Sequence, residues 1–175
     1  NVVIYEAAFR HDLLFVRVDV VKKCGNKVEL IEVKAKSIDP EDRSFFKKKT
    51  KELDSDWEPY LLDVAFQARV MSLAHPEYEV TPYLMLADKS STASIDGLNQ
   101  RFMLEKKDGR TRARTNPSTS KAPLGNQVLC KIDVSNEVSF INSTHKIGGR
   151  SFSESIEYLS KVYSNGTREL AGVSS

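Results

Sequence analysis

A two-residue turn between two apolar segments constrains the fold of this chain more than any other feature. Gly25-Asn26 separates residues 13–22 from residues 27–35, and both segments are rich in β-branched side chains. Such a turn joins two antiparallel strands into a hairpin. Residues 2–9 have the same strand-like composition. The sequence therefore predicts a three-stranded antiparallel meander at the start of a sheet.

Helix and strand patterns alternate through the rest of the chain. Asp56 is a candidate N-cap, Pro59 suits a first helical turn, and Pro76 ends the same helix. Further patterns predict strands at residues 80–87, 99–104 and 128–132, a helix at residues 151–163 and a flexible loop at residues 106–126. This order of elements predicts an α/β domain, a mixed sheet flanked by helices.

Length and composition are those of one soluble domain. The 175 residues suffice for a single domain over residues 1–175, with hydrophobic and charged fractions of 40% and 29%. No apolar run approaches the ~18 residues of a membrane-spanning helix. Cys24 and Cys130 are far apart, which predicts reduced thiols in a cytoplasmic protein, or one disulfide at most. Because the chain begins at Asn1 rather than Met, we expect a fragment of a longer protein.

The register of the second hairpin predicts a charged face on the sheet. A two-residue turn places Asp19 opposite Glu32 and Arg17 opposite Lys34. Side chains alternate between the two faces of a strand, so these four residues share one face. The other face is predicted to be an apolar layer that contains Val18, Val20, Ile31 and Val33.

A similar argument brings a third carboxylate to this charged face. If His11 and Asp12 form the first turn, Glu6 lies opposite Arg17. Directly opposed carboxylates such as Asp19 and Glu32 repel each other, so something must neutralise them. Mg²⁺ takes one or two carboxylates together with substrate phosphate. A metal ion with a cation beside it is the arrangement that phosphodiester hydrolysis requires.

These residues resemble the signature of a known nuclease superfamily. Asp19, followed by Glu32-Val33-Lys34, fits the D…(D/E)-x-K pattern of the PD-(D/E)XK nucleases. Gln67 stands in a segment similar to the glutamine motif of the RecB-like branch. The chain also resembles an uncharacterised bacterial family with a predicted nuclease domain of this type. That similarity continues to residues 83–86 and covers about the first half of the chain.

The resemblance implies a fold, a metal and a role for each site residue. The fold would be a restriction-endonuclease-like mixed sheet flanked by helices. Asp19, Glu32 and the main-chain carbonyl of Val33 would bind Mg²⁺ or Mn²⁺. Lys34 would position or activate the attacking water. Gln67 would reach back from its helix and order the site.

Several of these residues also have a structural interpretation. Asp19 and Glu32 can instead pair with Arg17 and Lys34 on an exposed sheet face. The resemblance makes Glu6 a further acidic ligand or a base, whereas a surface ion pair with Arg17 is an equally good explanation.

Other polar residues near the motif leave alternatives open. Gln67 can be a polar residue on the wet side of an amphipathic helix, and Asp63, one turn earlier, is expected to be structural. Lys36 can contact a phosphate or simply be solvated. The lysine-rich residues 47–51 are either a solvated segment or a contact to the DNA backbone.

Functions from different classes are therefore compatible with the sequence. The first is metal-dependent hydrolysis of phosphodiester bonds in single- or double-stranded DNA. The second is a catalytically inactive module of the same fold that binds nucleic acid or a protein partner. A purely structural domain is the third. The net charge of +2 permits a nucleic-acid partner without arguing for one.

Overall fold

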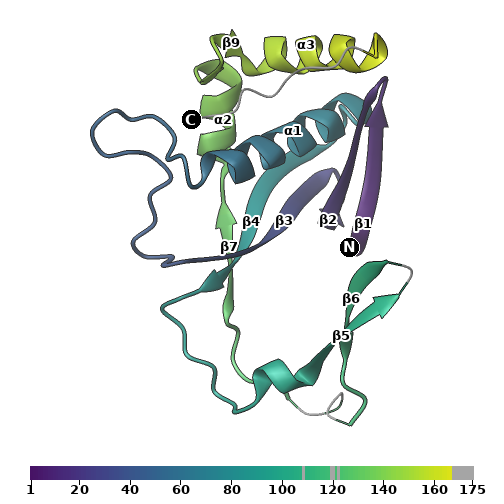
Figure 1. Cartoon of the computed structure of the whole chain (residues 1–175), viewed down its shortest axis with the longest axis vertical. Coiled ribbons are helices and arrows are strands. Elements are labelled where there is room, and N and C mark those ends of the chain that lie inside the picture. The colour runs from purple at the N-terminus through teal and green to yellow at the C-terminus, as the bar shows by residue number, and fades with distance from the viewer. Residues whose placement is uncertain (108, 119–120, 122, 167–175) are drawn as a thin grey trace.

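The computed structural model describes residues 1–107, 109–118, 121 and 123–166. Within these residues, a five-stranded sheet in the order β1-β2-β3-β4-β7 is flanked by three α-helices (Figure 1). The strands of the sheet are β1 (Val2–His11), β2 (Leu14–Cys24), β3 (Lys27–Ile38), β4 (Glu79–Asp88) and β7 (Leu129–Asp133), and the helices are α1 (Glu58–Ala74), α2 (Ser135–Ser143) and α3 (Phe152–Ser164).

The sheet is mixed, as predicted. β1, β2 and β3 form the expected antiparallel meander. α1 then crosses over to β4, which pairs with β3 in parallel, and β7 closes the sheet in antiparallel orientation to β4. The α/β class is therefore confirmed. No helix in the described ranges is long and apolar enough to cross a membrane.

The predicted register of the β2–β3 hairpin is confirmed for the residues close to its turn, and the ladder of paired residues ends at Val20. The ladder runs from Cys24–Lys27 to Val20–Ile31. The predicted pairs Asp19–Glu32 and Arg17–Lys34 lie beyond its last rung. The two strands separate there, which leaves room between them for a side chain.

The predicted register of the first hairpin is wrong by two residues. The turn is Asp12-Leu13, because His11 pairs with Leu14. Asp12 has a φ of +51°, a left-handed conformation that aspartate tolerates better than most residues. Arg17 consequently pairs with Ala8 rather than with Glu6.

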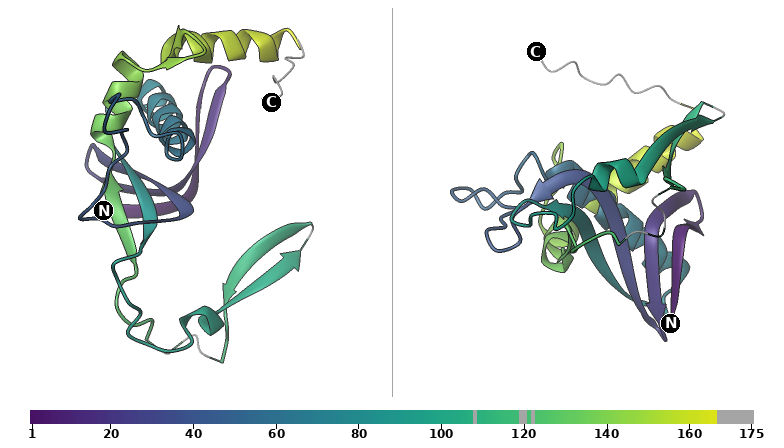
Figure 2. Two further views of the ribbon diagram at one scale, coloured as in Figure 1. Left: turned by 60° about the vertical axis from the view of Figure 1, so that its left-hand side comes forward. Right: turned by 90° about the horizontal axis from the view of Figure 1, so that it is seen from below.

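The predicted separation of the charged and apolar faces is confirmed only in part. Val18 is fully buried in the core and Ile31 is 5% exposed, as predicted, but Val33 is 45% exposed. In β3, Val28 and Leu30 belong to the core and share their face with Glu32, which is itself buried. The face of β3 that packs on the core is therefore the one that carries Glu32, which was predicted to be the charged face. The reason is α1, which packs against this face of the sheet (Figure 2). Its apolar side chains, among them Leu61, Val64 and Met71, are buried in the core there.

The start of α1 differs slightly from the prediction. Trp57, not Asp56, is the N-cap residue, and no side chain caps the helix. The main-chain carbonyl of Asp54 instead accepts hydrogen bonds from the N–H groups of Trp57 and Glu58, at 2.9 and 2.8 Å. Pro59 lies in the first turn, as predicted.

The loop predicted at residues 106–126 is partly a hairpin. β5 (Phe102–Lys107) pairs with β6 (Arg110–Thr115) in an antiparallel ladder that extends away from the main sheet (Figure 2). The alternation of polar and apolar residues is weak here because neither face packs on a core. Residues 108, 119, 120 and 122 of this predicted loop lie outside the described residues.

Short elements connect the rest of the chain. They are η1 (Leu98–Arg101), β8 (Lys146–Ile147) and β9 (Arg150–Ser151).

The two C-terminal helices differ in how well the sequence predicts them. α2 was not foreseen from the sequence, whereas α3 begins one residue after the predicted start. Ser151 caps α3 in a reciprocal capping box with Glu154. Cys24 and Cys130 are both free thiols.

Candidate active site

Four side chains from β3 and α1 meet in one hydrogen-bonded cluster, called the Glu32 cluster below. Its members are Glu32, Lys34, Asp63 and Gln67. The Lys34 ammonium lies 2.6 Å from Oε1 of Glu32 and 2.6 Å from Oδ2 of Asp63. The Gln67 amide donates to Oε2 of Glu32 at 2.9 Å and to Oδ1 of Asp63 at 3.1 Å. The cluster ties the strand to the helix.

The local geometry of the two elements explains why these residues meet. Glu32 and Lys34 are two residues apart in β3 and so point to the same face. Asp63 and Gln67 are four residues apart in α1 and lie one above the other on one side of the helix. Since α1 packs on the face of β3 that carries Glu32, both pairs point into the same space.

Asp19 lies beside the Glu32 cluster, at the point where β2 and β3 separate. Its Oδ2 accepts a hydrogen bond from the main-chain N–H of Val33 at 2.8 Å. The carboxylate thus replaces the carbonyl that a continuing ladder would have offered to Val33. This contact holds the Asp19 carboxylate against Val33, the residue between Glu32 and Lys34.

The electrostatics of the cluster reflect its partial burial. Glu32 is only 7% exposed, and burial raises the pKa of its carboxyl group above the ordinary value. The nearby negative charge of Asp19 also raises this pKa, while hydrogen bonds from Lys34 and Gln67 oppose the change. The Glu32 carboxylate, whose charge is disfavoured by burial and by Asp19, is a group that a bound cation would stabilise.

For Lys34, hydrogen bonds outweigh burial in setting the pKa. Burial lowers the pKa of its ammonium group, but hydrogen bonds to Asp63 and Glu32 together raise this pKa above its usual value. Lys34 therefore remains a cation at neutral pH and can donate protons in hydrogen bonds. It cannot accept a proton from water in this state.

The donor atoms near Asp19 and Glu32 suit a hard divalent cation. Both residues offer carboxylate oxygens, and each oxygen of Glu32 keeps a lone pair beside its hydrogen bond. The amide oxygen Oε1 of Gln67 is buried and accepts no hydrogen bond from the described residues. In the described ranges, no three His, Cys, Asp or Glu side chains are grouped as a metal site. Two carboxylates suffice for Mg²⁺, which completes its shell with water and phosphate.

Glu6 lies in an irregular part of β1. The rungs Tyr5–Val20 and Ala7–Val18 flank it, but Glu6 itself belongs to no rung and has a φ of +56°. Its Oε2 lies 2.7 Å from Nε of Arg17, and both side chains are more than half exposed. The surface ion pair considered from the sequence is thus present, through a diagonal contact.

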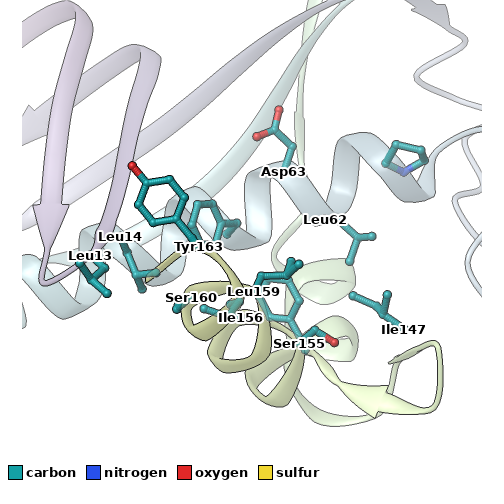
Figure 3. Close-up of a pocket in the computed structure, with 13 residues that line it drawn as sticks. Leu13, Leu14, Leu62, Asp63, Ile147, Ser155, Ile156, Leu159, Ser160 and Tyr163 are labelled. Carbon is teal, nitrogen blue, oxygen red and sulfur yellow. The ribbon is translucent and has the colours of Figure 1, made fainter. Parts of the chain in front are cut away.

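An apolar cleft of about 550 Å³ borders the Glu32 cluster. It lies between the tip of the β1–β2 hairpin, α1 and α3, and Asp63 belongs to its lining. Figure 3 shows Leu159 and Tyr163 of α3 and Leu14 of the hairpin among its lining residues, with the Asp63 carboxylate pointing away from them. The cluster therefore stands at the edge of an apolar hollow.

Asp63 is the member of the cluster that the sequence analysis ranked as structural. Its contacts with Lys34 and Gln67 give it a direct place in the candidate site. The sequence feature that indicates this place is the spacing of four residues between Asp63 and Gln67, which puts both on one side of a helix. Tyr60, one turn earlier, continues this row, and the Lys34 ammonium lies 5.8 Å from the centre of its ring.

Comparisons with protein-family models, curated proteins and solved structures found no match to this chain.

Proposed function

We propose that this chain is a metal-dependent nuclease that hydrolyses DNA phosphodiester bonds. The observation that carries the proposal is the convergence of Glu32, Lys34 and Gln67 next to Asp19. Two carboxylates, a lysine that stays charged and an amide are the groups that phosphodiester hydrolysis needs around one phosphate. The PD-(D/E)XK resemblance and the restriction-endonuclease-like arrangement belong to the same proposal.

Asp19, Glu32 and the main-chain carbonyl of Val33 would hold Mg²⁺ or Mn²⁺. When bound, such an ion polarises a phosphoryl oxygen and lowers the pKa of its water. The hydrogen bond between Asp19 and the Val33 N–H keeps two of these groups together. Gln67 holds the second oxygen of Glu32, which fixes the direction of the carboxylate.

Lys34 contributes a fixed positive charge rather than a base. Because its ammonium is shared between Glu32 and Asp63, it is oriented before substrate arrives. It can donate a hydrogen bond to an attacking water or to a phosphoryl oxygen and stabilise the negative charge that develops there. Asp63 is a positioning residue, because it acts through Lys34 and Gln67.

A cleavage assay with two matched variants tests the proposal. Asp19→Asn removes a charge but keeps an oxygen that can accept the Val33 N–H. Glu29→Gln removes the same charge from β3, three residues before Glu32, where Glu29 pairs with Lys22 and Lys131. We expect the wild type and Glu29→Gln to cut single- or double-stranded DNA in Mg²⁺ or Mn²⁺. Asp19→Asn should lose at least about 100-fold in rate, on the scale of one lost electrostatic contact.

The alternative is a catalytically inactive module that binds nucleic acid or a protein partner. One observation favours it: Lys34 already has two carboxylate partners, so its positive charge is paired without any ligand. DNA binding by the wild type, without cleavage in either metal, would select this alternative. Cleavage that Asp19→Asn retains in full would overturn the assignment of the site.

A further inference from the structure

We propose that the turn formed by residues 47–51 is a phosphate-binding track that guides a nucleic-acid strand to the Glu32 cluster. The lysines of this turn are Lys47, Lys48, Lys49 and Lys51, and it is called the lysine turn below. The inference rests on the proposed nuclease function and adds to it the surface that binds the substrate backbone.

The lysine turn is a structured element and not a loose segment. The N–H of Lys51 donates to the carbonyl of Lys47 at 3.0 Å, and the N–H of Lys47 donates to the carbonyl of Glu52 at 2.8 Å. Phe45 and Leu53, on either side of the turn, are 3% and 2% exposed and belong to the core. The turn therefore projects from an anchored base.

A continuous series of contacts joins this base to the Glu32 cluster. Phe45 packs edge-on against Trp57, with ring centres 5.1 Å apart. The Lys36 ammonium lies 4.2 Å from the centre of the Trp57 ring and 5.2 Å from that of Tyr60. Tyr60 also lies beneath the ammonium of Lys34, a member of the cluster. The loop that carries the turn runs from the end of β3 to the start of α1, the two elements that carry the cluster (Figure 1).

The charges of the lysine turn are available to a ligand. All four lysines are exposed. None of them forms an ion pair with a carboxylate in the described part of the chain. The molecule as a whole has a net charge of only +2, so this turn is a local concentration of positive charge. Closely spaced exposed lysines favour a polyanion with regularly spaced charges.

The backbone of Lys51 allows its side chain to be tested separately. Its φ of +60° is a left-handed conformation that glycine adopts without strain and that lysine adopts only at a cost. Replacement of Lys51 by glycine therefore removes the ammonium group without straining the turn.

DNA binding as a function of salt tests the track. Binding of a short duplex is measured in EDTA between about 50 and 200 mM salt, so that cleavage does not interfere. The turn variant is Lys47→Gln, Lys48→Gln and Lys49→Gln, which leaves the main-chain hydrogen bonds intact. The control variant removes three positive charges from the β5–β6 hairpin, with Lys106→Gln, Lys107→Gln and Arg112→Gln.

We expect the turn variant to bind more weakly and with a shallower salt dependence. The slope of log K against log salt should fall by about 0.9 for each lysine that contacts a phosphate, and so by up to about 2.7 for three. The control variant should keep the wild-type slope. Equal losses in both variants, an unchanged turn variant, or a wild type that does not bind DNA would each overturn the track.

Lys51→Gly separates binding from folding. Glycine relieves the strained φ, so this variant should be at least as stable as the wild type. The slope of log K for DNA binding against log salt should fall by about 0.9. A slope equal to that of the wild type would argue against a role for Lys51. Cleavage in Mn²⁺ is measured separately. A shallower salt slope in the lysine variants without any cleavage by the wild type would refute the nuclease function and support the phosphate-binding track. Cleavage by the wild type with unchanged slopes in the variants would support the nuclease function and refute the track.

Discussion

Glu32 is the residue on which the chemistry of the candidate site depends. Burial raises the pKa of its carboxyl group, but a metal ligand must be ionised. As pH falls, Glu32 therefore takes up a proton at a higher pH than an ordinary glutamate does. We expect the affinity for Mn²⁺ to rise with pH through this raised pKa and to become constant above it.

Gln67 should set the position of that transition. Its amide donates a hydrogen bond to the ionised carboxylate, which lowers the pKa of Glu32. Gln67→Leu removes this bond at similar volume, so the midpoint of Mn²⁺ affinity should move to higher pH. Calorimetric titrations at several pH values measure the shift. Gln100→Leu, at an exposed position, should leave the midpoint where it was, and an unmoved midpoint in Gln67→Leu would contradict this role.

Glu6 shows how two roles of one residue can be separated. Its carboxylate is exposed and pairs with Arg17, so Glu6→Gln should change the free energy of unfolding by under ~1 kcal/mol. We also expect Mn²⁺ affinity to stay within about twofold of the wild type, because the pair with Arg17 accounts for the carboxylate. A tenfold loss of affinity, about 1.4 kcal/mol, would restore Glu6 as a metal ligand.

At the scale of the element, α1 both covers the core and carries half of the candidate site. Leu61 is fully buried between α1 and the sheet, whereas Leu73 on the same helix is 41% exposed. Leu61→Ala should lower the free energy of unfolding by about 2–5 kcal/mol, and Leu73→Ala by under ~1 kcal/mol. Urea unfolding of both variants measures the difference. Equal losses would mean that α1 does not pack as described.

The sequence predicts elements better than it predicts the faces they bury. The Gly25-Asn26 turn fixes the register of its hairpin, since two residues admit few backbone geometries. The face of β3 that packs on the core was harder to assign, because Ile31 and Val33 are as apolar as Val28 and Leu30, and Ile31 is itself buried. α1 covers the face that carries Val28 and Leu30, and its crossover is a tertiary feature that no local pattern encodes.

Contacts between residues that are far apart in the sequence explain most of the remaining differences between the predicted and the observed structure. The hydrogen bond from the Val33 N–H to Asp19 arises because β2 and β3 separate, and no local pattern encodes this. Asp63 joined the site through Lys34, which is 29 residues away in the chain. The first turn moved to Asp12-Leu13 because aspartate tolerates a positive φ, a choice that the alternation pattern alone does not resolve.

At the scale of the whole molecule, three separate segments surround the candidate site. β2 supplies Asp19, β3 supplies Glu32 and Lys34, and α1 supplies Asp63 and Gln67. The apolar cleft under α3 borders the site on one side, and the loop with the lysine turn joins it through Trp57 and Tyr60. For the nucleic-acid substrate that we propose, the lysine turn would contact the phosphate backbone and the apolar border would face the bases.

Calorimetric titration of Mn²⁺ tests the proposal that Asp19 and Glu32 hold the metal of a nuclease. The three proteins compared are the wild type, Asp19→Asn and Glu29→Gln, at a pH where carboxylates are ionised. We expect one bound ion in the wild type and in Glu29→Gln, and an affinity at least about tenfold weaker in Asp19→Asn, which corresponds to about 1.4 kcal/mol. No binding by the wild type, or equal binding by Asp19→Asn, would contradict the proposed metal site.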